Sequence, residues 1–346
     1  METLQTLGIA LGLASLAGLN LYLTVFATGL SIQQGWVTLS PQYQQLDILA
    51  HPAVIAIAGV LYLLQFFADK VPWVDSLWDG IHTVIRPVGG ALLAVRALGS
   101  TDPTVEVIAA LLLGAVSLTV HSMKAGTRLL VNHSPEPFSN IALSVTEDVA
   151  VVGGLALINY DPVLALVVFG LVISSLIYLL PKFWRAIKVH SWLIWRKLSA
   201  PPVDELATEM PELLPPALHV PFHTANLLGE KIAWAVPCVS GAARRISGNL
   251  FGYLVATKED PTTLWFVANR RWRSLVVELD LRTYKAVHES KILSENLTFY
   301  SLEKKPRYTF VFDRSKTAIV KRIASEMTRT LANTTTQTPA ALAGST

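Results

Sequence analysis

Ionisable residues interrupt long apolar stretches in the first half of the sequence. His82 and Arg86 stand four residues apart, so on a helix they share one face. Pro87 follows Arg86 directly and predicts a kink or local unwinding, because proline removes a hydrogen bond from a helix. Glu147 and Asp148 stand at a similar depth in a later apolar stretch. We predict that Arg86 pairs with Glu147 or Asp148, because an unpaired charge in hydrocarbon costs several kcal/mol.

These polar residues have two interpretations. They are either a polar path for an ion, a proton or a polar headgroup, or a structural ion pair that fixes the order of the helices. Asn20, in the apolar segment GLNLYLTVF, is expected to hydrogen-bond across helices. The residue types alone leave both interpretations open.

A second group of bases ends another apolar stretch. His121, Lys124 and Arg128 are spaced by three and four residues, which places them on one helix face. Such a face could contact an anionic group, for example a lipid phosphate. Simple anchoring at the membrane interface explains the same pattern, because basic residues gather on the cytoplasmic side of membrane helices.

Charge is distributed unevenly along the 346 residues. Residues 1–180 hold five basic and eleven acidic side chains, whereas residues 181–346 hold 23 basic and 14 acidic ones. A water-soluble domain of 180 residues needs more charge than this to cover its surface. We therefore expect lipid to solvate the first part, and the basic second part to be soluble. Cys238 is the single cysteine, which excludes an internal disulfide bond.

Six segments are candidates for membrane-spanning helices. A span needs about 20 mostly apolar residues, because the hydrocarbon core is roughly 30 Å thick. The candidates are residues 7–30, 52–68, 80–99, 104–122, 140–158 and 162–180.

An X-Pro pair opens three of these runs, at His51-Pro52, Asp102-Pro103 and Asp161-Pro162, and suits a first helical turn. This repetition favours three helical hairpins in one α-helical bundle, although membrane helices also resemble one another by composition alone.

Loop charge predicts the orientation. Lys70, Lys124 and Arg128 follow the second and fourth candidate spans, and more bases follow the sixth, whereas Asp47, Asp102 and Asp161 mark the opposite side. Both termini are therefore expected in the cytoplasm, with the chain as a multi-pass protein of the cytoplasmic membrane.

The second half has a different pattern. We predict a membrane domain over 1–185, an amphipathic, proline-rich linker over 186–221, a cytosolic α+β domain over 222–332 and a disordered tail over 333–346. Short β-rich segments followed by a helix with Ile319, Val320, Ile323 and Met327 indicate a small curved sheet closed by a C-terminal helix.

Arg270, Arg271 and Arg273 form a basic group in this domain. These bases favour contact with anionic lipid headgroups at a membrane surface, and ordinary solvated charge is the alternative. Nucleic acid is not expected as a partner, since no motif for it is present.

Motifs for catalysis are missing from the sequence. It has no G-x-S-x-G, no Walker loop and no H-E-x-x-H, and its Cys and His residues lack zinc-site spacing. We therefore predict no catalytic residues, no metal and no cofactor, and we do not expect an enzyme.

Two resemblances add to this interpretation. The segments GLNLYLTVFATGL, FFADKVPWVDSLWDGIHTVIRPVGG and HSMKAGTRLLVNHSPEPFSN, with TEDVAVVGG, resemble the membrane proteins called domain of unknown function 4126, over about residues 5–185. GYLVAT, LWFVANRRWRSLVVELDL and TFVF resemble a bacterial pleckstrin-homology-like (PH-like) module over about residues 245–330. Such modules commonly bind lipids or proteins, so the resemblance implies a lipid or a protein partner for the cytosolic domain.

Two functions follow as hypotheses. One is a transporter or channel-like protein for a small polar solute, ion or lipid headgroup, with His82, Arg86, Glu147 and Asp148 along its path. The other is a membrane-anchored scaffold whose PH-like domain binds lipid or protein.

Overall fold

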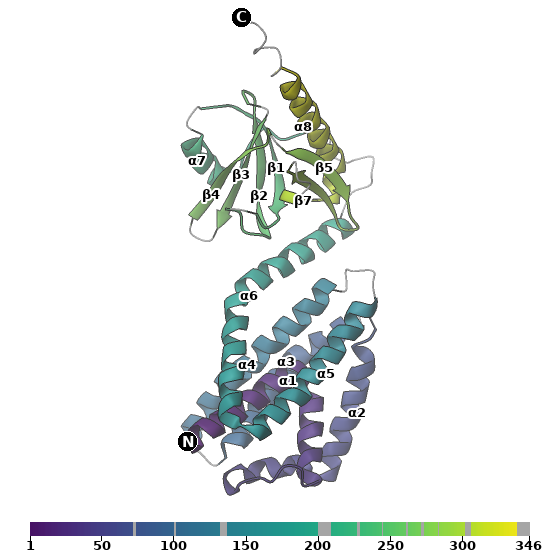
Figure 1. The fold of residues 1–346 in the computed structure, drawn as a ribbon, viewed down its shortest axis with the longest axis vertical. Coiled ribbons are helices and arrows are strands. Elements are labelled where there is room, and N and C mark those ends of the chain that lie inside the picture. Colours follow the sequence, from purple (N-terminus) through teal and green to yellow (C-terminus); the bar gives the residue numbers. More distant parts are fainter. Residues whose placement is uncertain are drawn as a thin grey trace, which may run out of the picture. The chain divides into compact units, whose positions relative to one another are not determined.

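The chain forms two compact units, Met1–Ile187 and Lys188–Thr346, in a computed structural model. The structure describes the backbone of the whole chain apart from residues 72–73, 100–101, 132–136, 200–208, 227–228, 244, 261, 271–272, 283, 302–305 and 338–346. The first unit is helical, and the second is built on a sheet (Figure 1).

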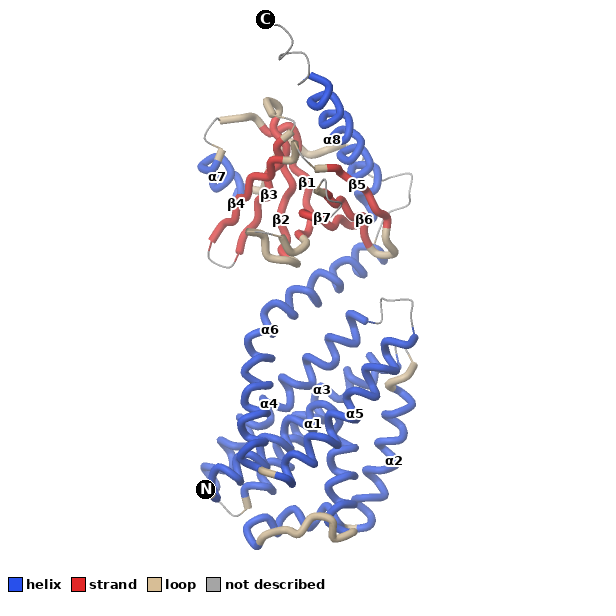
Figure 2. Tube along the Cα trace, viewed as in Figure 1, coloured by secondary structure: helices blue, strands red, loops and turns tan. Residues whose placement is uncertain are grey.

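Helices account for the regular structure of the first unit (Figure 2). Proline opens five of the described helices of this unit, including the 3-10 helix, because the N–H groups of a first turn have no partner within the helix and proline lacks this group. The Asp102 and Asp161 carboxylates accept hydrogen bonds from first-turn amides and so cap α4 and α6. The elements are α1 (Glu2–Gln33), the 3-10 helix η1 (Pro41–Ala50), α2 (Pro52–Ala68), α3 (Val74–Leu98), α4 (Pro103–Val131), α5 (Pro137–Tyr160) and α6 (Pro162–Leu198), which continues past the unit boundary.

Five of the described helices are long and apolar enough to cross a membrane: α1, α3, α4, α5 and α6. The predicted second span is the exception. α2 has 17 residues, and at about 1.5 Å per residue it is shorter than a hydrocarbon core of roughly 30 Å. It qualifies only together with η1, across a bend of 62°, and the six predicted spans are reached only with this pair.

The outer faces of these helices are apolar. Val84, Leu111 and Leu171 are 65–70% exposed, whereas Arg86 and Arg128 are almost completely buried. This distribution is the reverse of that in a water-soluble helical protein, which places its charges outside. It is the arrangement expected when lipid surrounds the bundle.

Helix α1 contacts α2, α3, α4 and α5, so it is the centre of the helical unit. Its small residues let the neighbours approach closely. A Cβ atom on Gly18 would lie 2.6 Å from the Ser117 carbonyl oxygen of α4, which only glycine avoids. Leu13, Ala14 and Ala17 fill the contact with α3 and η1.

The second unit is an open antiparallel sheet of seven strands in the order β4-β3-β2-β1-β7-β6-β5. Two meanders, β1 to β4 and β5 to β7, join where Val239 and Ser240 of β1 pair with Val311 and Phe310 of β7. The strands are β1 (Ile232–Ser240), β2 (Leu250–Thr257), β3 (Thr263–Arg270), β4 (Arg273–Asp280), β5 (Lys285–Ser290), β6 (Ser294–Tyr300) and β7 (Pro306–Asp313).

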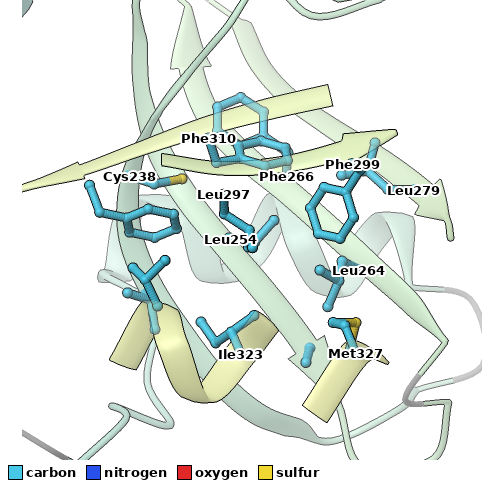
Figure 3. Close-up of a cluster of buried hydrophobic side chains, with 14 of the residues drawn as sticks. Cys238, Leu254, Leu264, Phe266, Leu279, Leu297, Phe299, Phe310, Ile323 and Met327 are labelled. Carbon is cyan, nitrogen blue, oxygen red and sulfur yellow. The ribbon is translucent and has the colours of Figure 1, made fainter. Parts of the chain in front are cut away.

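Helix α8 (Thr317–Gln337) follows the short η3 (Arg314–Lys316) and covers one face of the sheet. Phe266, Phe299 and Phe310 meet Ile323 and Met327 of α8 in the core (Figure 3). The four apolar positions predicted for this helix are all buried. On another face, Leu218 and Phe222 of α7 (Pro216–Ala225) pack on Val255 and Val267.

The linker and the tail differ from their predicted ranges. α6 continues to Leu198 and α7 begins at Pro216, so both ends of the predicted linker are helical, and 200–208 lie outside the described residues. α8 runs to Gln337, past the predicted start of the tail at 333. The threonine-rich composition suggested a disordered tail. Extending an existing helix by one residue costs less than starting a new helix, so α8 continues into this segment. Residues 338–346 lie outside the described part of the chain.

Truncating the sheet core will destabilise the second unit. Leu297→Ala removes a fully buried side chain of β6, with an expected loss of about 2–5 kcal/mol. Hydrogen exchange of the β6 and β7 amides in the full-length protein measures it. Ile292→Ala, at a side chain that is 61% exposed, is the control and is expected to change little. Equal protection in the two variants would contradict the assignment of Leu297 to the core.

Glu295 ties α8 to the sheet and gives this unit a pH dependence. Its buried carboxylate lies 2.6 Å from His288 Nε2 and accepts hydrogen bonds from Ser290 and Thr317. Burial alone would raise the pKa of Glu295, but these hydrogen bonds hold it below its ordinary value. Because its pKa is lower in the folded state, the ionised Glu295 carboxylate stabilises the fold at pH values above its unfolded-state pKa of about 4.3. This stabilisation is lost as the pH falls through the lower, folded-state pKa.

We therefore expect Glu295→Gln to accelerate hydrogen exchange in α8 at neutral pH. The difference in exchange rate between this variant and the wild-type chain should become smaller below about pH 4, because the wild-type carboxylate then gains a proton and loses its charge. Glu278→Gln, at an exposed position of β4, is the matched control. A difference that stays constant across this pH range would mean that the charge of Glu295 does not contribute.

Candidate functional site

Helix α1 is broken at Asn20. The backbone there has φ −149° and ψ 93°, far from helical values, inside a helix of 32 residues. A break frees backbone groups, which have to find partners away from water. The Asn20 side chain supplies one of them, because its Oδ1 accepts the Leu23 amide at 3.0 Å and caps the second half of the helix.

Two buried bases satisfy the carbonyl groups beside this break. Arg86 Nη1 of α3 lies 3.4 Å from the Gly18 carbonyl oxygen, and Lys124 Nζ of α4 lies 2.9 Å from that of Leu19. Both side chains are almost completely removed from solvent. The irregular part of α1 is therefore held by cations from two neighbouring helices.

Arg86 also contacts its own helix and His121. Its Nη2 lies 3.4 Å from Oδ1 of Asp79, seven residues earlier in α3. Its Nη1 lies 2.9 Å from Nδ1 of His121. Arginine only donates, so Nδ1 accepts and the ring hydrogen resides on Nε2, which faces the Asp79 carbonyl oxygen at 3.0 Å. His121 therefore contributes a neutral ring.

The predicted partner of Arg86 was wrong. Within the described residues its ion pair is Asp79 rather than Glu147 or Asp148. Spacing along the sequence indicates depth in the bundle but not the direction around the helix axis, and Asp79 lies on the same face of α3 two turns away.

Glu147 instead pairs with the bases of α4. Arg128 Nη2 donates to Glu147 Oε2 at 2.6 Å and Nε to Oε1 at 3.4 Å, so two parallel contacts join these side chains. Lys124 Nζ lies 3.0 Å from the same Oε2. Asp69, after the end of α2, lies 3.2 Å from Arg128 and 3.5 Å from Lys124.

His121, Lys124 and Arg128 therefore do not lie at the surface. They are at most 5% exposed, which contradicts the expectation of simple anchoring at the interface. The predicted span ended at residue 122, but α4 continues to Val131 and its last turns still pack inside the bundle. Contact with an external anion is not tested by this placement.

Asp148 has neutral partners. Asn20 Nδ2 donates to its Oδ1 at 3.0 Å, and the Tyr62 hydroxyl donates to its Oδ2 at 3.0 Å. The hydrogen bond expected of Asn20 across helices is thereby confirmed. His82 lies to one side of this group, with its Nδ1 2.7 Å from the Trp78 carbonyl oxygen and its Nε2 2.8 Å from the Tyr22 hydroxyl.

We call these side chains the buried polar cluster: Asn20, Tyr22, Tyr62, Gln65, Asp69, Asp75, Asp79, His82, Arg86, His121, Lys124, Arg128, Glu147 and Asp148. Sequence reasoning found eight of them as candidate site residues. It placed Asp69, Asp75 and Asp79 between two predicted spans, outside the membrane, and gave Tyr22, Tyr62 and Gln65 no role. The available signal was the series of carboxylates at 69, 75 and 79, six and four residues apart, together with the basic face formed by His121, Lys124 and Arg128.

The basic group of the second unit is only partly described. Arg273 is exposed at the start of β4, opposite Arg270 in the hairpin register, whereas Arg271 and the Arg270 side chain lie outside the described residues. Across the described residues no three or more His, Cys, Asp or Glu side chains are grouped to hold a metal ion.

Removing one charge of the cluster will destabilise the helical unit. Glu147→Gln leaves Lys124 and Arg128 short of a carboxylate, and loss of one partner of a buried pair costs about 3–5 kcal/mol. The measurement is thermal unfolding of the full-length protein in detergent. Replacing both Arg128 and Glu147 by Met is expected to restore part of the loss. The exposed Glu2→Gln is the control, and melting equal to that of Glu147→Gln would contradict the prediction.

Comparisons with known proteins give one family. A search of curated proteins finds no match. A solved structure described as Vav1 inhibited by an allosteric inhibitor is 12% identical, and the match covers 90% of this chain and 53% of that chain, so this chain spans about half of its length. Its TM-score is 0.21, too low to establish a shared fold. The family model described as "Domain of unknown function (DUF4126)" matches residues 7–182, about half of the sequence, and the chain belongs to this family.

Proposed function

We propose that this protein is a membrane transporter or channel-like protein for a small polar solute, an ion or a lipid headgroup. The observation that carries the proposal is the break of α1 at Asn20, whose freed carbonyl groups face Arg86 and Lys124. Membrane proteins tolerate irregular backbone only where it is buried in protein or lines a cavity. Transporters place their substrate sites at such discontinuous helices, near the middle of the bilayer.

The buried polar cluster allows its bases to exchange ion-pair partners. Arg128 lies within 4 Å of four carboxylates, those of Asp69, Asp75, Asp79 and Glu147. Glu147 and Asp69 are the nearer two, at 2.6 and 3.2 Å, and Asp75 and Asp79 lie at 3.8 and 3.9 Å. A shift of the helices that lengthens one of these contacts can therefore shorten another. Rocking of the two halves of α1 about Asn20 would then redistribute these pairs around a polar substrate, with His82, Arg86, Glu147 and Asp148 along its path.

The proposed setting is the cytoplasmic membrane, with both termini in the cytoplasm. An even number of spans is needed for this, which the bent pair of η1 and α2 supplies as one of six. The burial of Lys124 and Arg128 removes two of the bases that indicated the orientation. The bases around the end of α6 still support it, namely Lys182, Arg185, Lys188, Arg196 and Lys197.

We assign the second unit a regulatory or docking role as a PH-like module. Two antiparallel meanders with a C-terminal helix over one face support this assignment. Its ligand would be an anionic lipid headgroup or a protein partner, with Arg270, Arg271 and Arg273 as candidate surface bases.

One observation favours the alternative of a membrane-anchored scaffold. Each buried base of the helical unit already contacts a carboxylate, which is what a network that only fixes helix order requires. In that case the helices anchor the chain, and the second unit carries the function.

Flux through the purified protein in liposomes separates the two functions. We expect uptake of at least one solute or ion from a broad panel, and a decrease of at least about tenfold in Arg86→Gln, because about 1.4 kcal/mol of lost stabilisation along the path already gives that factor. Arg96→Gln, at an exposed position of α3, should transport normally. Folding is checked by the unfolding midpoint of each variant. A folded wild-type protein that passes nothing favours the scaffold.

A further inference from the structure

We propose that the buried polar cluster binds and releases a proton at Asp148. Proton binding stands on the geometry of the cluster, whereas coupling of the proton to transport rests on the function proposed above. The proposed ligand of this site is therefore a proton. If the chain transports a polar substrate, the proton crosses in exchange for it; otherwise the proton crosses alone.

The charges of the cluster do not balance. Its bases are Arg86, Lys124 and Arg128. His121 is neutral by its hydrogen bonds. His82 counts as neutral too, with Nδ1 donating to the Trp78 carbonyl oxygen and Nε2 accepting from the Tyr22 hydroxyl. Lys70, half-buried at the end of α2, adds a fourth positive charge at the rim. Among the described residues the carboxylates of the cluster number five: Asp69, Asp75, Asp79 and Glu147, which are buried, and Asp148, which is half-buried. One carboxylate remains in excess even when Lys70 is counted, and an uncompensated buried charge is neutralised by a proton more cheaply than it is solvated by protein.

We assign Asp148 as the carboxylate that is in excess of the bases. Among the described residues no base lies within ion-pair distance of it, and its two hydrogen-bond partners, Asn20 and Tyr62, are neutral. The charged groups that face it at longer range are Asp69 and Lys70 beyond the end of α2 and Lys124 of α4. Glu147 is its neighbour on α5, but two bases already occupy that carboxylate.

Asp148 can take up a proton beside the Tyr62 hydroxyl without any movement of heavy atoms. In the charged state its hydroxyl donates to Asp148 Oδ2 at 3.0 Å. When Oδ2 takes a proton from the medium, the new O–H donates to the tyrosine oxygen over the same distance, and the tyrosine hydrogen rotates away. No other bond forms or breaks in this step.

The other partner links the proton to the broken helix. Asn20 donates to Asp148 Oδ1 through Nδ2 while its Oδ1 caps the second half of α1. A hydrogen bond to a carboxylate is roughly twice as strong as one to a neutral acceptor. Protonation of Asp148 therefore loosens the bond that fixes Asn20, and with it the break in α1.

A row of side chains on α2 leads from Asp148 to the helix end. Tyr62, Gln65 and Asp69 follow at spacings of three and four, on one face. Gln65 and Asp69 are at most 2% exposed, and Gln65 Nε2 lies 3.5 Å from Asp69 Oδ2. Their other oxygens, Gln65 Oε1 and Asp69 Oδ1, are buried acceptors that receive no hydrogen bond from the part of the chain that the structure describes. A buried acceptor without a donor calls for an explanation, and transient acceptance of a proton that leaves Asp148 is the one we propose for this row.

Infrared difference spectroscopy tests proton binding directly. The full-length protein in liposomes is titrated from alkaline to acid pH, and the carbonyl stretch of a protonated, buried carboxyl group is followed. We expect a band that is lost in Asp148→Asn and kept in Asp47→Asn, an exposed control. Tyr62→Phe should move the midpoint of the band upward by about one pH unit, because the charged form loses a charge-assisted hydrogen bond. A band that survives Asp148→Asn, or no such band at all, overturns the proposal.

Proton movement in the same liposomes, read from a trapped pH-sensitive dye, separates this inference from the function proposed above. The Asp148 band without any flux supports proton binding and counts against transport. Flux with no band at Asp148, and with the same pH dependence in Asp148→Asn, overturns the proton site and leaves transport standing. Both results together support a proton-coupled path. The unfolding midpoint of Asp148→Asn, compared with Asp47→Asn, shows that the variant is folded.

Discussion

The helical unit depends on the contacts between the broken part of α1 and the bases of its neighbours. A helix surrounded by apolar groups has to satisfy every backbone polar group internally, so an interruption at Asn20 is stable only if donors reach Gly18 and Leu19. Arg86 and Lys124 are those donors. Their charges in turn need carboxylates, which Asp79, Asp69 and Glu147 provide. The break and the buried charges therefore stabilise one another, and neither would persist alone.

This dependence also fixes the arrangement of the helices. The members of the cluster come from α1, α2, α3, α4 and α5, and ion pairs of the α4 bases connect this helix to α5 and to the end of α2. Apolar contacts between helices are weakly directional, particularly where the surroundings are apolar as well. Charged contacts discriminate among neighbours because a wrong neighbour leaves a charge unpaired, at a cost of several kcal/mol.

Much of the fold could be predicted from the sequence, because it depends on local signals. Pro103 and Pro162 begin helices, and the strands and α8 follow their apolar periodicity. The connections within the site could not be predicted in this way. The residue types of eight cluster members drew attention to them, but which residues pair depends on the rotation of each helix about its axis. Arg86 illustrates this, since its partner lies on its own helix.

The second unit shows what a buried carboxylate needs when it has a structural role. Glu295 is surrounded by His288, Ser290 and Thr317, which together supply donors to both of its oxygens, and Arg314 lies 3.6 Å away. The helical unit is built differently: in its described residues the cluster has more carboxylates than bases, and some buried acceptors receive no hydrogen bond.

Selection for stability alone would not favour the buried polar cluster. Well-packed apolar side chains of similar volume can often replace buried ion pairs without loss of stability. An unbalanced cluster beside a broken helix is costly to keep, and it is useful only if its charge state or its pairing changes. This reasoning, rather than the presence of buried charges as such, favours a path through the helical unit over a simple anchor.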